Sequence, residues 1–462
     1  MSFPKYAAYK DSGIEWLGEV PAHWRIDRLK ASIETCRNGI WGEEAQEDGN
    51  DIPCVRVADF DRRKLRVELS EPTIRNVTEK ERNGRVLRRG DLLLEKSGGG
   101  EKQPVGCVVL YDDMRPAVCS NFVARMVLAP GQDPSYWRYV HAAAYAVRLP
   151  IGSINQTSGI QNLDQARYFN EPVAFPPKPE QAAIATFLDR ETAKIDALVE
   201  EQRRLIELLK EKRQAVISQA VTKGLDPNVP MKDSGVEWLG KVPAHWLVCT
   251  LRRVISSIEQ GWSPECDAYP ADDQSWGVLK AGCVNHGVFN PAENKSLPQT
   301  LTPVPEYEVH SGDILVSRAS GSPELVGSAA LVGETRSKLM LSDKIFRVHL
   351  TLHMVNAFFV WAMNGKALRD QIERALSGGN GLANNLPQSA MLAFLVAVPP
   401  IDEQQLIASA VEHSVRKCDA LIAQAACAVD LLLERRSALI SAAVTGKIDV
   451  RGLVPEPESV AA

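Results

Sequence analysis

The side chains that could do chemistry in this 462-residue chain form no catalytic constellation. A glycine-rich segment beside a lysine, residues 97–102, has the composition of a phosphate-binding loop. It lacks the G-x-x-x-x-G-K-[ST] spacing that cradles a nucleotide, so we interpret it as a flexible loop. No H-E-x-x-H, no G-x-S-x-G and no closely spaced carboxylate cluster occurs. We therefore predict no catalytic residue and expect a binding or scaffolding role.

Two proline pairs superficially resemble the (Asn/Asp)-Pro-Pro-(Tyr/Phe) signature of adenine methyltransferases. They stand in Phe175-Pro176-Pro177 and Val398-Pro399-Pro400. Both lack the polar first residue that would hold the adenine amino group, and no glycine-rich cofactor loop follows a strand upstream. Because proline restricts its predecessor to extended backbone, we interpret both as stiff entries to a helix. Methyl transfer by this chain itself is not expected.

The cysteines and histidines predict no metal site. The nine cysteines are scattered, odd in number and never spaced as C-x-x-C, which argues against both zinc and a disulfide scaffold. His23 and His245 each stand in Pro-Ala-His-Trp, where a packing role is expected. The chain shows no signal-peptide pattern and no run of 18 apolar residues, so we expect a cytoplasmic protein without a metal or cofactor of its own.

Charge points to nucleic acid only locally. The formal net charge is -5, with 53 Lys and Arg against 58 Asp and Glu. Residues 56–96, however, hold twelve Lys and Arg against eight Asp and Glu, a local excess of four. The run Arg62, Arg63 and Lys64 is our candidate for phosphate contacts. The alternative is a solvated loop or strand edge.

The chain is a tandem duplication. KDSGIEWLGEVPAHW at residues 10–24 recurs as KDSGVEWLGKVPAHW at residues 232–246, which is 222 positions later. The same offset aligns Gly90-Asp91 with Gly312-Asp313, and an offset of 223 aligns Glu180-Gln181 with Glu403-Gln404. Between these motifs the two halves have diverged almost completely. Each half is therefore a variable globular body followed by a similar tail.

Each tail predicts one long helix with an apolar seam. Apolar residues recur about every 3.5 positions without a helix breaker, and such a helix of about 43 residues would be on the order of 65 Å long. A helix of this length needs a partner, so we expect the two helices to pack against each other in antiparallel fashion. The predicted seam consists of Ile184, Leu188, Ile195, Leu198, Leu205, Leu209, Val216, Ile407, Val411, Leu421, Leu432 and Leu439.

The repeated motifs together resemble a known family. The pattern E-W-L-G-x-V-P-x-H-W before a variable domain, a Gly-Asp-(Ile/Leu)-Leu turn inside it, and Pro-Pro-x-x-Glu-Gln opening a long helix all occur twice. This combination resembles the specificity subunits of type I restriction-modification systems, over residues 10–447.

The resemblance implies an α+β fold. It consists of two tandem-repeated mixed α/β target-recognition domains separated by two long antiparallel coiled-coil helices with pseudo-two-fold symmetry. We expect strands near residues 105–111 and 327–332, and helices over 134–148 and 352–376. The expected segments are a first recognition domain, 1–178; a first helix, 179–223; a second recognition domain, 224–401; a second helix, 402–446; and a mobile tail, 447–462.

The resemblance also implies partners. Specificity subunits bind double-stranded DNA and read a split target, one part per recognition domain. Two copies of a modification subunit, an adenine methyltransferase, dock on the helices, and ATP-dependent restriction subunits join them. S-adenosylmethionine, ATP and Mg are therefore expected in the partner subunits and not in this chain.

Polar segments near the Gly-Asp turn are the candidates for reading bases. Asn, Gln, Arg and Ser supply the donors and acceptors that major-groove edges require. The alternative for each residue is a solvent-exposed turn. The candidates are Lys96, Ser97, Lys102, Ser153, Asn155, Gln156 and Thr157 in the first domain, and Ser317, Arg318, Ser320, Ser322, Asn380, Asn384 and Asn385 in the second.

Two alternative functions stay open at this point. One is a self-sufficient DNA enzyme, which the missing nuclease, methylase and ATPase motifs disfavour. The other is a coiled-coil adaptor without a DNA role, which leaves two large variable bodies unexplained. The helix pair is also asymmetric, because Cys418 and Ala425 stand where the first helix has Ile195 and Gln202. Which helix face docks partners is therefore not predicted.

Overall fold

The computed structural model describes residues 3–157, 159–377 and 384–453. The chain divides into two compact units, residues 1–202 with 427–462 and residues 203–426. Each unit holds one globular domain and part of both long helices, α4 (Lys178–Lys223) and α8 (Ile401–Val444). We call the globular parts, residues 3–177 and 224–400, the first and second domains. The predicted α+β class and its two long helices are confirmed.

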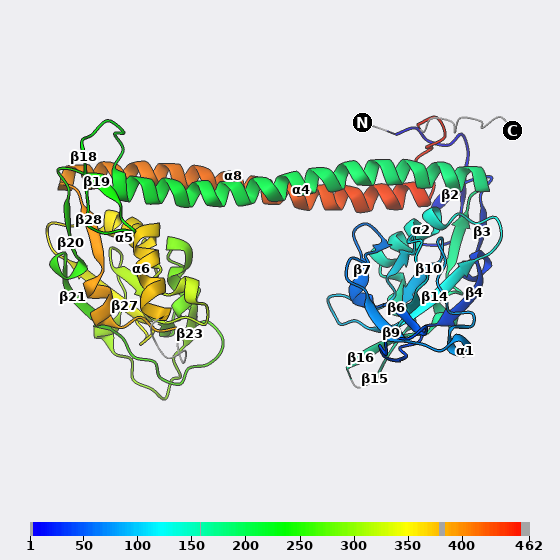
Figure 1. The fold of residues 1–462 in the computed structure, drawn as a ribbon, viewed down its shortest axis with the longest axis horizontal. Helices are drawn as coiled ribbons and strands as arrows, with labels where there is room; N and C mark the ends of the chain where they lie inside the picture. The colour runs from blue at the N-terminus through cyan, green and yellow to red at the C-terminus, as the bar shows by residue number, and fades with distance from the viewer. Residues whose placement is uncertain (1–2, 158, 378–383, 454–462) are drawn as a thin grey trace. The chain divides into compact units, whose positions relative to one another are not determined.

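The first domain is built on a six-stranded sheet of order β4-β14-β10-β12-β8-β7, and α2 (Pro134–Ala146) lies between this sheet and α4 (Figure 1). A four-stranded sheet (β13-β6-β9-β5), a three-stranded sheet (β11-β16-β15) and the pairs β17-β3 and β1-β2 surround it. The strands are β1 Tyr9–Asp11, β2 Glu19–Pro21, β3 Arg25–Arg28, β4 Ile33–Asn38, β5 Glu43–Glu44, β6 Asp51–Val55, β7 Phe60–Asp61, β8 Arg66–Val67, β9 Thr73–Asn76, β10 Leu92–Glu95, β11 Ser97–Gly98, β12 Val108–Leu110, β13 Val118–Cys119, β14 Val123–Leu128, β15 Ile154–Thr157, β16 Ile160–Leu163 and β17 Pro172–Phe175; the short helices are α1 Glu79–Arg82 and α3 Gln165–Tyr168.

The second domain repeats the central strands. Its four-stranded sheet, β21-β27-β24-β25, has the order of β4-β14-β10-β12, and the register agrees, since Leu92 pairs with Met126 and Ile314 with Val348. The strands are β18 Met231–Asp233, β19 Lys241–Pro243, β20 Leu247–Thr250, β21 Ile255–Gln260, β22 Gly277–Leu279, β23 Asn294–Ser296, β24 Ile314–Ser317, β25 Ala329–Leu331, β26 Leu339–Met340, β27 Ile345–Leu350 and β28 Leu395–Val398. The duplication therefore extends to strand pairing where the sequences have diverged.

The helix predicted over residues 352–376 is two helices. α5 (Asn356–Asn364) ends at Gly365, and α6 (Lys366–Ser377) follows it, with a short α7 (Gln388–Ala393) further on. The backbone of Gly365 is extended, and a Cβ there would lie 2.9 Å from a Val221 methyl of α4. Close approach of the long helix thus explains the break.

The seam of the long helices agrees only in part with the predicted one. Leu188, Ile195 and Leu209 are buried, but Leu198 and Leu205 are 45% and 43% exposed. The neighbouring Val199 is buried and Ile206 is half-buried. In α8, likewise, Leu421 is 40% exposed while Ile407, Val411 and Leu439 are buried. The inclusion of Leu198, Leu205 and Leu421 in the seam was therefore wrong.

The physical reason is that polar residues occupy some seam positions. The heptad positions after Leu188 include Thr192, whose buried hydroxyl donates to the Leu188 carbonyl at 2.6 Å. A further seam position holds Arg213, which pairs with Asp419 of α8 at 2.9 Å. Because Thr192 holds the seam position between Leu188 and Ile195, the next step along the seam is four residues, to Val199, and not three, to Leu198.

Two ion pairs fix the antiparallel register, one in each unit. Asp196 pairs with Arg436 at 3.2 Å in the first unit, and Arg213 pairs with Asp419 in the second. The two pairs are 17 residues apart in α4 and 17 residues apart in α8, in opposite sequence directions. The helix ends also enter the domain cores: Ile184 and Ala443 belong to that of the first domain, Ile217 and Ile407 to that of the second.

Part of the predicted mobile tail is packed. Ile448 and Val450 are buried, and the Asp449 amide donates to the Pro4 carbonyl at 2.8 Å. Residues 447–453 thus pack on the first unit, because two apolar side chains follow the helix end closely. Residues 454–462 of that predicted segment lie outside the described residues.

The repeated Trp and Glu motifs form one joint in each unit. The Trp24 indole donates to Glu180 at 2.9 Å and His23 contacts the other carboxylate oxygen at 2.7 Å. In the second unit Trp246 and His245 contact Glu403 at 3.1 and 2.8 Å. Glu180 and Glu403 stand in the first turns of α4 and α8.

Each of these tryptophans also touches the glycine that follows the other long helix. A Cβ at Gly446, after α8, would lie 3.2 Å from the Trp24 ring, and one at Gly224, after α4, would lie 3.3 Å from the Trp246 ring. Both glycines have a positive φ, 71° and 78°, as expected after a helix end. Each tryptophan therefore joins the start of one helix to the end of the other.

Replacing Trp24 with Phe keeps most of the apolar ring but removes the N–H that Glu180 accepts. Because the carboxylate then loses a buried partner, we expect the free energy of unfolding of the first unit to fall by about 1–3 kcal/mol. Urea denaturation followed by circular dichroism measures it. Trp41→Phe is the control, since Trp41 is 39% exposed; equal losses in the two variants would refute the joint.

Candidate nucleic-acid interface

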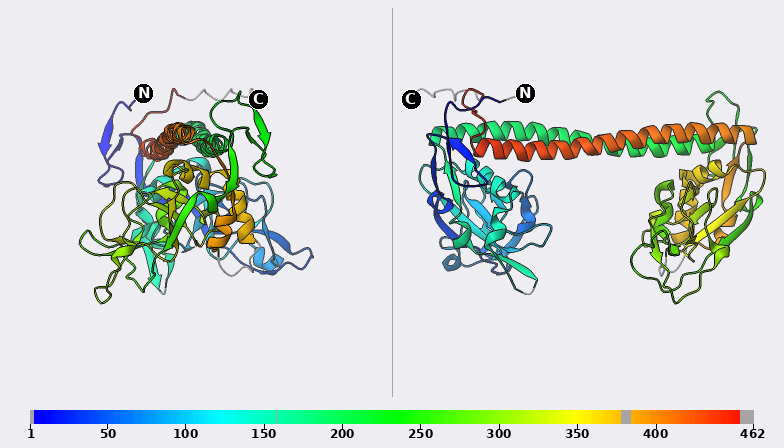
Figure 2. Two further views of the ribbon diagram at one scale, coloured as in Figure 1. Left: turned by 90° about the vertical axis from the view of Figure 1, so that its left-hand side faces the viewer. Right: turned by 180° about the vertical axis from the view of Figure 1, so that it is seen from behind.

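A small sheet in the first domain brings the candidate segments together. β11 pairs with β16, which pairs with β15 in a hairpin, so that Asn162 lies opposite both Ser97 and Asn155. The Leu163 amide donates to the Lys96 carbonyl at 2.8 Å. The hairpin lies at the end of the domain that is opposite α4 (Figures 1 and 2). Two stretches that are separated by more than fifty residues thus form one surface.

The candidate side chains of the first domain divide into exposed and internal ones. Asn155, Gln156 and Lys102 are exposed and Lys96 is half-buried. The Ser97 hydroxyl donates to Asn162 at 2.6 Å, and Ser153 is fully buried. The two serines therefore support the surface, whereas the amides and lysines are accessible. Thr157 is the last residue of β15.

The second domain makes the same arrangement. The Leu386 amide donates to the Arg318 carbonyl at 2.8 Å, as Leu163 does to Lys96. The Ser320 amide donates to Asn384 at 3.2 Å, and Ala319 bridges to Asn385. The two candidate segments of this domain are therefore also joined by backbone hydrogen bonds. Asn380 lies outside the described residues.

The candidate side chains of the second domain have local partners. Ser317 is fully buried. The Arg318 guanidinium donates to the Asp343 carbonyl at 3.1 Å. The Ser320 hydroxyl accepts from the Ser322 amide at 3.3 Å, and the Asn384 amide group donates to the Gly321 carbonyl at 3.1 Å. Arg318, Ser320, Ser322, Asn384 and Asn385 are half-buried, and Ser317 is internal.

The basic run expected to contact phosphate has acidic partners within the first unit. Arg62 donates to the buried Glu95 at 2.8 Å. Arg63 pairs with Glu200 of α4 at 2.6 Å, and Lys64 with Asp61 at 3.4 Å. Burial raises the pKa of the Glu95 carboxyl group, while the Arg62 guanidinium favours its charged form. These pairs make the run a weak phosphate candidate and give it a different task, holding the β7–β8 turn near α4.

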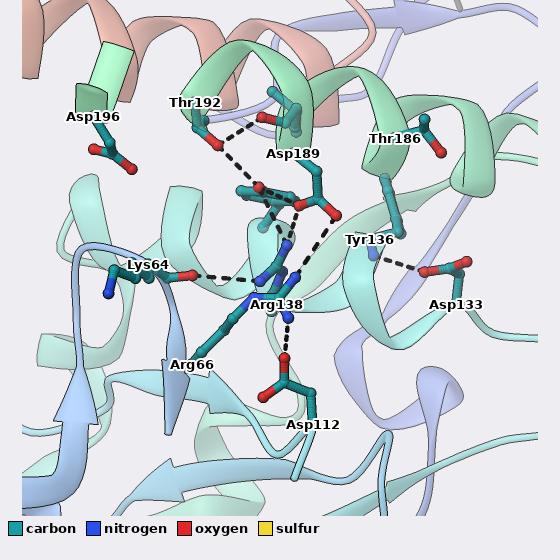
Figure 3. Close-up of polar contacts among 12 residues, drawn as sticks. Lys64, Arg66, Asp112, Asp133, Tyr136, Arg138, Thr186, Asp189, Thr192 and Asp196 are labelled. Atoms are coloured by element: carbon teal, nitrogen blue, oxygen red, sulfur yellow. Dashed lines mark hydrogen bonds and ion pairs between the residues drawn. The ribbon is translucent and has the colours of Figure 1, made fainter. Parts of the chain in front are cut away.

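A charged network behind this run continues the same contact (Figure 3). Arg138 of α2 is almost fully buried and pairs with Asp189 of α4, and it also donates to the Lys64 carbonyl at 3.3 Å. The Tyr139 hydroxyl donates to Asp189 at 2.6 Å. Arg66 pairs with Asp112 and reaches Asp189 at 4.0 Å. The network therefore fixes α4 on the first domain.

The sequence interpretation missed residues that build the surface. Gln161 and Asn162 form the central strand of the small sheet. The signal was present, since Ser158-Gly159 between two short polar and apolar runs is typical of a hairpin turn. It also missed Arg125 and Arg347, which pair with Asp91 and Asp313 of the Gly-Asp turns at 2.6 and 3.2 Å. These turns therefore have a structural role.

Among residues 3–157, 159–377 and 384–453, no group of three His, Cys, Asp or Glu side chains could hold a metal ion. In those same ranges, every helix is too short or too polar to cross a membrane.

The chain is a tandem-repeat protein with two similar α+β domains and a pair of long helices. Its fold is similar to that of a chain from a type I restriction-modification complex, with a TM-score of 0.68, 13% identity and coverage of 92% and 98% of the two chains. It is also similar to the HsdS subunit of Thermoanaerobacter tengcongensis, with a TM-score of 0.52, 14% identity and coverage of 93% and 98%.

Sequence relatives agree with the fold. The EcoEI type I restriction enzyme specificity subunit of Escherichia coli is 33% identical over 242 residues, 52% of this chain and 40% of that subunit. The putative MjaX specificity subunit of Methanocaldococcus jannaschii is 22% identical over 94% of this chain and 96% of its own length. No protein-family model matches the chain. The chain is a homologue of type I restriction enzyme specificity subunits.

The network of Figure 3 predicts a graded loss of stability. Asp189→Ala leaves the buried Arg138 guanidinium without its carboxylate, so we expect the first unit to lose about 1–3 kcal/mol of unfolding free energy. Arg63→Ala breaks more exposed pairs and should cost less than about 1 kcal/mol. Urea denaturation of both variants measures the difference; the opposite order would contradict the network.

Proposed function

We propose that this chain is the sequence-specific DNA-binding subunit of a type I restriction-modification complex, with each domain reading one half of a bipartite target. The observation that supports this proposal is a set of backbone hydrogen bonds that both domains share. In it Lys96 and Arg318 occupy equivalent positions, while the side chains of the neighbouring segments differ. A constant backbone that presents different side chains suits the reading of two different half-sites.

The charge of the chain supports a proposal in which other subunits make most of the phosphate contacts. The net charge is -5, and the run at Arg62 is occupied by acidic partners. Phosphate contacts, which position a protein on DNA, then come largely from partner subunits. The exposed Asn155, Gln156 and Lys102 supply the groups that read base edges.

The partners in this proposal are two modification subunits and the restriction subunits. The long helices offer exposed leucines for docking, Leu198, Leu205, Leu208 and Leu421 among them. The chain itself is non-catalytic, and S-adenosylmethionine, ATP and Mg act in the partner subunits. Neither a self-sufficient enzyme nor an adaptor without a DNA role explains two domains that present differing side chains on one frame.

Methylation is the readout that tests the proposal. We co-express the chain with the adenine methyltransferase of its host's type I system and sequence the DNA for methylated adenine. The expected result is a split motif with fixed spacing. Lys96→Ala with Arg318→Ala should lower the affinity for that motif by roughly 5- to 150-fold for each lost base contact. A stable complex that methylates nothing would contradict the function, and unchanged affinity would remove Lys96 and Arg318 from the interface.

The helices set the spacer in this proposal. Residues 206–212 of α4 lie opposite 420–426 of α8 in the register of the Arg213–Asp419 pair, within the second unit. Removing both heptads keeps the seam in phase and shortens each helix by about 10 Å. We expect the methylated motif to keep both half-sites but to change its spacer. The control removes residues 454–462; an unchanged spacer in the double deletion would show that the helices are not the ruler.

A further inference from the structure

One loop occupies the same place in both domains and displays different side chains. The Lys96 amide donates to the Phe122 carbonyl at 2.9 Å, and the Arg318 amide donates to the Lys344 carbonyl at 2.8 Å. The loop turns in the same way, with Val123 donating to Ser120 at 3.0 Å and Ile345 to Ser342 at 3.3 Å. We call residues 120–123 and 342–345 the paired loops.

The paired loops adjoin the candidate surface in each domain. Lys96 is bonded to Phe122 on one side and to Leu163 on the other, through its amide and its carbonyl. Arg318 is bonded in the same way to Lys344 and Leu386. The same three segments thus follow one another in the same order in each domain. Side chains of the paired loops therefore lie beside those of the candidate base-reading segments.

In the first domain the paired loop presents an amide and an aromatic ring. Asn121 is exposed and Phe122 is 49% exposed. Phe122 and Trp41 line a hollow of about 430 Å³, which Asn121, Ser120 and Arg56 border. Large exposed aromatic side chains around a hollow mark a binding surface. Both polar and apolar groups are therefore available to one ligand.

In the second domain the equivalent positions are charged. In the alignment of the two halves, Asp343 corresponds to Asn121 and Lys344 corresponds to Phe122. The Lys344 ammonium group lies 3.4 Å from the Asp343 carboxylate and its side chain is 54% exposed. Arg318 donates to the carbonyl of the same Asp343. The second loop therefore presents a cation and a carboxylate, with Arg318 beside them, where the first presents an amide and a ring, with Lys96 beside them.

The edges of DNA bases match these two sets. Asn bonds to adenine N6 and N7, and Phe contacts the methyl group of thymine, the apolar group that an A·T pair shows in the major groove. Lys and Arg bond to guanine O6 and N7, and Asp accepts from cytosine N4. Asn121 with Phe122 thus suits an A·T pair, and Asp343, Lys344 and Arg318 suit a G·C pair.

We propose that the paired loops are base-reading positions, with Asn121 and Phe122 selecting an A·T pair in one half-site and Asp343 and Lys344 selecting a G·C pair in the other. This inference rests on the proposed function and adds the residues and the base class at one position of each half-site. The surrounding frame is the same, so exchanging two side chains exchanges the preference.

The test exchanges the loops in the full chain, bound to its methyltransferase partner. Asn121→Asp with Phe122→Lys converts the first loop into the second, and the motif is read by binding to a random DNA library followed by sequencing. We expect one position of one half-site to change from A·T to G·C while the other half-site is unchanged. Met114→Lys is the matched control, because it also places a lysine at an exposed apolar site of the first domain, 80% exposed.

A second measurement uses the native chain. Replacing thymine by uracil at the assigned position removes only the methyl group and should weaken binding several-fold in the native chain, but not in Phe122→Lys. A folded exchange variant that keeps the native motif, or binds no sequence at all, would overturn the assignment. If instead the native complex selects no split sequence, the proposed function fails and the loops are not at fault.

Discussion

The structure depends on how Trp24 and Trp246 join the helix ends to the domains. Each indole donates to the glutamate in the first turn of one long helix and lies against the glycine after the other. Glu180 is buried and Glu403 is half-buried. A carboxylate that is removed from water needs such partners, because an unsatisfied charged group in an apolar setting is costly. The long motifs that the two halves share are therefore explained by helix attachment and need no role in binding.

This attachment of the helices belongs to the part of the structure that is the same in both domains, and it is separate from the loops that differ between them. Both domains share the order of the four central strands and the Gly-Asp turns with Arg125 and Arg347. They also share the backbone hydrogen bonds around Lys96 and Arg318. Loop side chains beside this frame differ. A duplicated domain can thus acquire a new binding preference by changing exposed residues, without disturbing the core that carries the helix.

The amino-acid sequence predicted those parts of the fold that depend on repeated motifs and on the spacing of apolar residues. The duplication, the α+β class and the long helices follow from repeats and from helical periodicity. The exact seam did not follow, because Thr192 and Arg213 take seam positions through a hydrogen bond and an ion pair. Apolar periodicity cannot foresee a polar residue that finds its partner on another segment.

The interface shows the same limit. Residue types selected Asn155 and Arg318, and the turn at Ser158-Gly159 could have indicated that β15 pairs with β16. No local pattern indicated that β16 also pairs with β11, or that Arg318 bonds to Leu386. The basic run at Arg62 has carboxylate partners, Glu95 and Glu200, that are distant in sequence and that a local charge count leaves out. A charge count gives the number of basic side chains in a segment. Binding to phosphate depends on which of those side chains have no carboxylate partner in the folded protein.

The two joints also differ in how they are completed. In the second unit Gly224 continues directly toward the Pro-Ala-His-Trp motif along the chain. In the first unit the corresponding space is closed by segments that contain Tyr6 and Arg451: the Tyr6 hydroxyl donates to Glu180 at 3.2 Å, and Arg451 lies over the Tyr6 ring at 4.8 Å. Since the Asp449 amide also bonds to the Pro4 carbonyl, residues 447–453 pack as part of the first joint, although the composition of this segment alone indicated a free tail.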